Sequence, residues 1–236
     1  MIIMQSKRAR LDRFISVKTG INRKNVRLLL AKGLVEVDGD IARNIDQIID
    51  EFSDVSLEGE VLQSNSPSYV MLHKPVGVVS ATVDDKHKTV IDLLTDKSKH
   101  DLHIVGRLDL NTSGLLLLTN DGRWSKKLMS PHHKVGKLYR VTLQNPIDDS
   151  YVKAFAEGIY FEFEDIITKP AQLALVDSHT ALVTLVEGRY HQIKRMFGRF
   201  RNPVIGLHRI SVGKILLDSQ LTPGMSRSLT AQEISL

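Results

Sequence analysis

Apolar positions near the start of the chain follow the spacing of two short helices. Within residues 10–32 they form two runs at helical spacing, with Gly20 between the runs and Asn22 placed to cap the second. These positions are Leu11, Phe14, Ile15, Val26, Leu29 and Leu30. The pattern predicts two short helices, the second ending at Gly33.

Alternating apolar and polar residues then predict strands at residues 35–37 and 54–57. Asp38-Gly39 follows the first strand directly, and this dipeptide is a strong signal for a tight hairpin turn. Together with the two helices, these strands predict a small helix-helix-strand unit.

A polar segment separates this unit from the rest of the chain. Residues 63–68, Gln-Ser-Asn-Ser-Pro-Ser, lack apolar periodicity and contain a proline, which is typical of a linker. We therefore expect a first domain at residues 1–62, the linker at 63–68 and a larger domain at 69–236.

The larger domain shows mainly strand patterns, with helices at irregular intervals. Strands are expected at residues 69–73, 115–119, 137–144 and 181–187. Helices are expected at residues 124–129, 150–157 and 191–200. Because strands and helices do not alternate strictly, we predict an α+β fold with a mixed, mainly antiparallel sheet and flanking helices, rather than a doubly wound sheet.

Composition limits the class of protein. The apolar share of 42% and the charged share of 25% are typical of folded globular proteins. Cysteine is absent, which excludes disulfide scaffolds and cysteine nucleophiles and fits a reducing compartment. No stretch approaches the ~18 apolar residues of a membrane span or has the order of a secretion signal. We expect a soluble, cytoplasmic protein that does not bind membranes.

Basic residues are concentrated at the start of the chain. The net charge is +5, and nine of the 32 Lys and Arg residues precede Gly33, together with a single acid, Asp12. The nine are Lys7, Arg8, Arg10, Arg13, Lys18, Arg23, Lys24, Arg27 and Lys32. Such a cluster attracts a polyanion through phosphate contacts, although a solvated helix face would also look like this.

One loop concentrates candidate chemistry. In residues 106–122, the guanidinium of Arg107 and the carboxylate of Asp109 lie between glycines and ahead of an apolar strand. Catalytic side chains are often carried by loops held by a strand, but the same pair would suit an ordinary surface turn. Phosphate-binding, dinucleotide-binding, nucleophile-elbow and metal-site patterns are absent from the sequence, so no cofactor or metal is expected.

Four sequence blocks resemble the RsuA-type pseudouridine synthases. They are Lys74-Pro75-x-Gly77, Gly-Arg-Leu-Asp with the following strand at 106–122, Lys137-x-Tyr139-Arg140-Val141, and residues 187–197, Glu-Gly-Arg-Tyr-His-Gln-Ile-Lys-Arg-Met-Phe. Residues 10–57 are similar to an S4 RNA-binding domain. The resemblance implies a cofactor-free isomerase that converts uridine in RNA to pseudouridine.

The resemblance also implies roles for three residues. Asp109 corresponds to the catalytic carboxylate, which in this family acts by addition to C1′, by addition to C6 or by elimination to a glycal. Lys194 corresponds to the cation beside it, where related synthases often have arginine, and Tyr139 to the tyrosine against the target base. Without the resemblance, Lys194 could be a solvated helix residue and Tyr139 an ordinary strand aromatic.

Contacts to RNA are expected from both domains. By similarity, Arg107 would fill the gap left when the target uridine is flipped out. Arg189, His191 and Gln192 could contact phosphate or base edges, although polar residues at a helix start often only cap it. In the first domain the candidates are Arg8, Arg10, Arg13, Arg23, Lys24 and Arg27.

The expected substrate is 16S ribosomal RNA, met in a subunit assembly intermediate by a monomeric enzyme. Two alternatives remain open on the sequence alone. One keeps the chemistry and places the target in 23S ribosomal RNA. The other is a non-catalytic RNA-binding or ribosome assembly factor, against which the joint presence of Asp109, Tyr139 and Lys194 argues.

Overall fold

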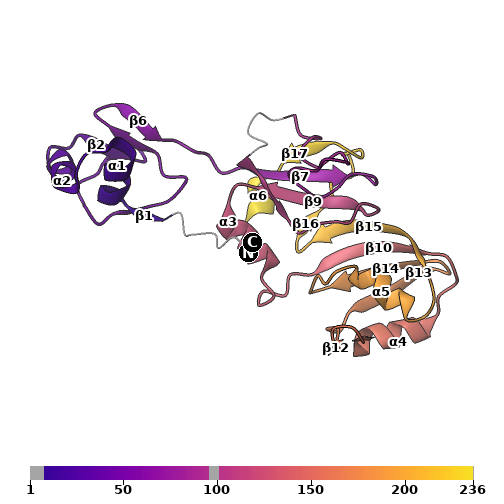
Figure 1. The fold of residues 1–236 in the computed structure, drawn as a ribbon. Helices are drawn as coiled ribbons and strands as arrows, with labels where there is room; N and C mark the ends of the chain where they lie inside the picture. Colours follow the sequence, from indigo (N-terminus) through magenta and orange to yellow (C-terminus); the bar gives the residue numbers. More distant parts are fainter. Residues whose placement is uncertain (1–7, 96–100, 236) are drawn as a thin grey trace. The chain divides into compact units, whose positions relative to one another are not determined.

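The structure is a computed structural model that describes residues 8–95 and 101–235 (Figure 1). The chain divides into two compact units, Met1–Pro67 and Ser68–Leu236. Lys7, counted above with the basic residues, lies outside the described residues.

The first unit packs two helices with short strands. The helices are α1 (Leu11–Thr19) and α2 (Arg23–Ala31). The strands are β1 (Ala9–Arg10), β2 (Val35–Val37), β3 (Asp40–Ile41), β4 (Ile48–Ile49), β5 (Val55–Leu57) and β6 (Glu60–Gln63). Four of them form an antiparallel sheet in the order β3-β2-β5-β6, and β1 pairs with β4.

Local signals in the sequence are confirmed here. The Asn22 side chain accepts a hydrogen bond from the Asn25 amide and caps α2. Asp38 and Gly39 form the turn between β2 and β3, both with positive φ, as a tight hairpin requires. The predicted apolar faces of α1 and α2 pack against the strands in one core.

A buried carboxylate joins the two helices of this unit. Asp12 is fully buried and binds the guanidinium groups of Arg23, at 2.7 Å, and Arg10, at 3.2 Å. Burial alone would raise the pKa of Asp12, but the hydrogen bonds from Arg23 and Arg10 outweigh it and hold this pKa below its ordinary value. Arg10 also contacts Asp46 at 2.6 Å.

The predicted linker begins one residue later than expected. Gln63 is the last residue of β6, and its side-chain amide donates hydrogen bonds to the carbonyls of Asp50 and Ser53. The polar side chain of Gln63 therefore binds the backbone of a turn inside the first unit.

The second unit is built on a nine-stranded sheet. Its main path runs β13-β14-β10-β15-β9-β7-β17, with β16 paired to β15 and β8 paired to β9. The strands are β7 (Tyr69–Lys74), β8 (His103–Val105), β9 (Ser113–Thr119), β10 (Lys137–Leu143), β13 (Gln172–Asp177), β14 (Thr180–Leu185), β15 (Val204–Val212), β16 (Ile215–Leu216) and β17 (Ser226–Ser228). Only β9 and β15 pair in parallel among these, so the predicted mixed, mainly antiparallel α+β fold is confirmed.

In the described part of this unit, four helices and a small hairpin accompany the sheet. They are α3 (Gly122–Met129), α4 (Asp149–Glu157), α5 (Gln192–Gly198), α6 (Ala231–Ile234) and the pair β11 (Tyr160–Phe161) and β12 (Ile166–Ile167). Helices α4 and α5 lie beside the β10-β14-β13 end of the sheet (Figure 1), and their apolar side chains share one core with these strands. Asp121 and Asp148 cap α3 and α4, since their side chains accept hydrogen bonds from backbone amides of the first turn.

Strand β9 is buried on both faces. Leu115 and Leu117 pack in a core with α3, whereas Leu116 and Leu118 pack in a second core with the segment that follows β7. The loop before β9 is therefore attached to one of the most rigid parts of the unit.

Two expectations about the last third of the chain were incomplete. Helix α5 ends at Gly198 rather than at residue 200, and it starts after His191, whose φ of 49° lies in the left-handed region. The long strand β15 at the centre of the sheet was not predicted. Among the described residues, no helix is long and apolar enough to cross a membrane.

Candidate active site

Asp109 lies on the loop between β8 and β9, and buried groups hold the backbone of this loop. Lys74, at the end of β7, is fully buried and donates hydrogen bonds from Nζ to the carbonyl oxygens of Thr112 at 2.8 Å and Asp109 at 3.1 Å. It also reaches the carbonyls of Pro75 and Leu110. One ammonium group thus holds the backbone of Asp109 and of the residues that follow it.

Two further side chains hold the same loop. The Ser80 hydroxyl donates to the Leu108 carbonyl at 2.7 Å and accepts from the Leu108 amide at 3.1 Å. Arg209 is 1% exposed and donates to the carbonyls of Gly106 and Leu115. Lys74, Ser80 and Arg209 were not predicted as site residues from the sequence, although the Lys-Pro-x-Gly block contains the first of them.

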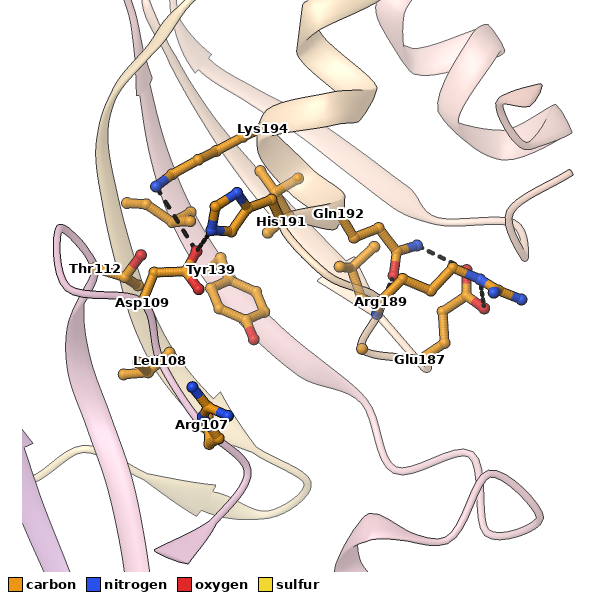
Figure 2. Close-up of a pocket in the computed structure, with 14 residues that line it drawn as sticks. Arg107, Leu108, Asp109, Thr112, Tyr139, Glu187, Arg189, His191, Gln192 and Lys194 are labelled. Carbon is orange, nitrogen blue, oxygen red and sulfur yellow. Dashed lines mark hydrogen bonds and ion pairs between the residues drawn. The ribbon is translucent and has the colours of Figure 1, made fainter. Parts of the chain in front are cut away.

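Two cationic or titratable groups face the Asp109 carboxylate. Lys194 Nζ lies 3.7 Å and His191 Nε2 lies 3.4 Å from Asp109 Oδ2. Figure 2 shows both side chains pointing at the carboxylate, Lys194 from α5 and His191 from the position just before this helix. The three side chains are each about one-third exposed, so these contacts contribute ~1 kcal/mol or less to stability. Their effect is to place positive charge beside one oxygen of an accessible carboxylate.

The candidate residues of the second unit line one pocket. They are Arg107, Asp109, Tyr139, Arg189, His191, Gln192 and Lys194. The Tyr139 ring lies beside Asp109, and Arg107 is exposed at the other end of the pocket from Lys194 (Figure 2). The basic candidates of the first unit belong to a separate compact body.

Gln192 has a supporting position in this pocket. It is 3% exposed, and its amide donates to Glu187 Oε1 at 2.7 Å and accepts from the Arg189 amide at 3.1 Å. Glu187 also accepts from the Lys169 amide and from the Arg189 guanidinium. These bonds fix the segment that leads into His191, so Gln192 acts here on the protein backbone.

Two residues of the pocket region were not singled out from the sequence. Thr112 Oγ1 is buried and has no hydrogen-bond partner among the described residues. Tyr190 is 76% exposed, and its ring stacks on His191 with centroids 3.9 Å apart. No group of three or more His, Asp or Glu side chains placed to bind a metal ion occurs in the described part of the chain.

A family profile described as RNA pseudouridylate synthase matches residues 68–198, which include all four sequence blocks noted above. The chain belongs to this family. It is therefore an isomerase that acts on RNA, and the resemblance noted in the sequence is confirmed.

Relatives and a solved structure extend this match over nearly the whole chain. Ribosomal small subunit pseudouridine synthase A of Pseudomonas aeruginosa is 50% identical over 226 residues, which cover 95% of this chain and 98% of that protein. The protein of the same name from Escherichia coli K12 is 42% identical over 227 residues, covering 96% and 98%. A crystal structure of a pseudouridylate synthase superposes with a TM-score of 0.70 at 39% identity, covering 95% of this chain and 97% of that one.

Lys74 gives a testable pH dependence. Burial lowers its pKa from the ordinary 10.5 to about 8, although the charge of Asp109 opposes this shift. The unfolded chain therefore binds the Lys74 proton more tightly than the folded chain, and the free energy of unfolding should gain a contribution that rises between about pH 8 and pH 10.5. Denaturant titrations across this range should show a smaller rise for Lys74→Met than for the unchanged protein.

Lys153→Met is the matched control, because Lys153 is an exposed lysine on α4. Lys153→Met should show the same rise in the free energy of unfolding with pH as the unchanged protein. Equal slopes for Lys74→Met and the unchanged protein would contradict the burial argument. Carbon NMR of labelled lysines provides a second measurement, in which the Lys74 Cε signal should titrate near pH 8.

Proposed function

We propose that this protein converts a uridine of small-subunit ribosomal RNA to pseudouridine, with Asp109 as the catalytic carboxylate. The observation that carries the proposal is the placement of Asp109 on a rigid loop, in a pocket where Lys194 and His191 face its side chain. The names of relatives at 42% and 50% identity favour the small-subunit target over 23S ribosomal RNA.

The reaction needs an ionised carboxylate at a fixed position. Breaking the bond between C1′ and N1 develops positive charge on the sugar, and a carboxylate can add to that carbon or stabilise the charge. Addition to C6 and elimination to a glycal likewise use the ionised form. Lys194 lies 3.7 Å from the carboxylate, where its ammonium group can hold the carboxylate in position.

Other pocket residues fit roles around the flipped base. Tyr139 lies beside Asp109, where its ring can contact the uracil and take part in proton transfer. Arg107 is exposed at the pocket rim, where a guanidinium can occupy the space that the extruded uridine leaves in the RNA stack. Arg189 and His191 supply donors for phosphate or base edges at the opposite wall.

The first unit is proposed to be an S4-like domain that binds RNA phosphates. Asp12 holds Arg10 and Arg23 in fixed positions at the junction of α1 and α2. Arg13, Lys24 and Arg27 are exposed on the same two helices, and Arg8 precedes them. Contacts of this kind orient an RNA by its backbone and leave target choice to the pocket of the second unit.

The setting proposed for this activity follows the sequence expectations. The enzyme acts as a monomer in the cytoplasm, on ribosomal RNA within a subunit assembly intermediate. The cysteine-free sequence and the small-subunit names of the relatives support this setting.

Asp109→Asn should abolish pseudouridine formation, because an amide cannot add to carbon or stabilise positive charge as a carboxylate does. We expect a loss of at least about a thousandfold in rate, with RNA binding retained. The measurement is carbodiimide-dependent primer extension on small-subunit RNA from cells that lack their own enzyme. A stop that persists at full strength in the variant would refute Asp109 as the catalytic group.

Lys194→Met should lower turnover by about a hundredfold, because it removes a fixed charge beside the carboxylate. Its unfolding temperature should change little, since a pair one-third exposed contributes little stability. Rates under single-turnover conditions, compared with those of the exposed-lysine control Lys153→Met, test this. Unchanged turnover in Lys194→Met would remove Lys194 from the site.

Replacing Arg13, Lys24 and Arg27 together with glutamine should weaken RNA binding and flatten its salt dependence. Each lost phosphate contact should reduce the slope of log K against log salt concentration by about 0.7 to 0.9. Filter binding at several salt concentrations measures this slope. A triple variant with the slope of the unchanged protein would show that this surface does not contact RNA phosphates.

A further inference from the structure

A second cleft opens where two central strands separate. Strands β9 and β15 pair at only two positions, His208 with Ser113 and Arg209 with Gly114. Before His208, β15 remains paired with β10, whereas the chain before Ser113 turns into the loop that carries Asp109. The space between them is about 520 Å³, within the range of sites that bind small molecules. We call it the diverging-strand cleft.

Polar groups form a row across three strands at this cleft. His208 pairs with Ser113 on one side and with Arg140 on the other, and all three line the cleft. Ser113 Oγ lies 2.9 Å from His208 Nδ1. Burial, His73 and Arg140 lower the pKa of His208, which favours its neutral ring. Since Ser113 occupies Nδ1, the ring can offer Nε2 to one hydrogen-bonding group at the edge of a nucleobase.

Apolar side chains complete the cleft. Val76 and Ile205 are 58% and 66% exposed although both are aliphatic, and both line it. None of its described lining residues is acidic, whereas Arg140 and Lys194 bring positive charge. Apolar surface for a base face, hydrogen-bonding groups for its edge and cations for a phosphate together match a nucleotide.

The cleft adjoins the candidate active site. Lys194 and Leu207 line both the diverging-strand cleft and the pocket of Asp109. A chain whose uridine enters the Asp109 pocket therefore has its neighbouring nucleotide within reach of the cleft.

We propose that the diverging-strand cleft binds the nucleotide next to the target uridine, with its base against Val76 and Ile205 and its phosphate at Arg140. The proposal rests on the proposed function, because the occupant is a flanking nucleotide of the substrate RNA. It makes Arg140, Ile205 and Val76 determinants of the sequence around the target.

The test follows methyl signals in the full-length protein. With Ile, Leu and Val methyl groups labelled, the protein is titrated with hexauridylate, hexacytidylate and hexaadenylate by NMR. The Ile205 and Val76 methyl signals should shift saturably with at least one of these RNAs. The methyl of Ile167, which is 67% exposed on the β11–β12 hairpin, should not. Arg140→Gln should raise the dissociation constant for the Ile205 shift about tenfold, and the matched control Lys153→Gln less than about twofold.

Three outcomes would overturn the proposal. They are no shift of Ile205 and Val76 with any RNA, an unchanged dissociation constant in Arg140→Gln, and equal shifts with inorganic phosphate alone, which would show an anion site. This readout needs no catalysis. Saturable shifts in a protein that forms no pseudouridine would therefore refute the proposed function and leave the nucleotide cleft standing.

Discussion

The candidate site depends on the bonds between the buried Lys74 ammonium and the carbonyl groups of the Asp109 loop. This loop has no regular secondary structure of its own between β8 and β9. Burying a charge is costly unless polar partners surround it, and here the backbone carbonyls of Asp109 and of the residues after it provide those partners. The cost of dehydrating the lysine is offset only when the loop is in place. Lys74 therefore couples the packing of β7 to the position of a surface carboxylate.

Different residues therefore hold the backbone of the site and face the Asp109 carboxylate. Lys74, Ser80 and Arg209 bind backbone atoms and leave the pocket to other side chains. Gln192 and Glu187 hold the segment before α5 by bonding to each other and to backbone amides, and both also line the pocket. The groups that face the Asp109 carboxylate are held less tightly and remain partly exposed, as access by a large RNA requires.

The sequence predicted the elements whose signals are local. The helices of the first unit, the Asp38-Gly39 turn and the Asn22 cap of α2 depend on near neighbours, and the structure contains them. Strand β15 was missed because its burial alternates irregularly and it includes Gly206 and several polar residues, which make sense only between β9 and β10. The partners of β15 lie far away in the sequence, and β15 itself has no regular alternation of apolar and polar residues from which a strand could be predicted.

The candidate site was only partly predictable for the same reason. Family motifs placed Asp109, Tyr139 and Lys194 together, and they line one pocket. The fully buried state of Lys74 could not be derived, since lysine is usually exposed. The supporting position of Gln192 depends on Glu187, five residues earlier in an irregular segment.

Gly114 pairs with Arg209 one residue beyond the position where β9 and β15 separate, and it limits which residues can occupy this part of the sheet. A Cβ atom there would lie 2.3 Å from the Arg209 carbonyl oxygen, and φ is 110°. Every other amino acid brings that atom, so this position tolerates almost no drift. Val76, Asn111 and Ile205, which line the diverging-strand cleft, are exposed and meet no such steric limit. Substitutions at these three positions can therefore change the lining of the cleft without disturbing the point where the strands part.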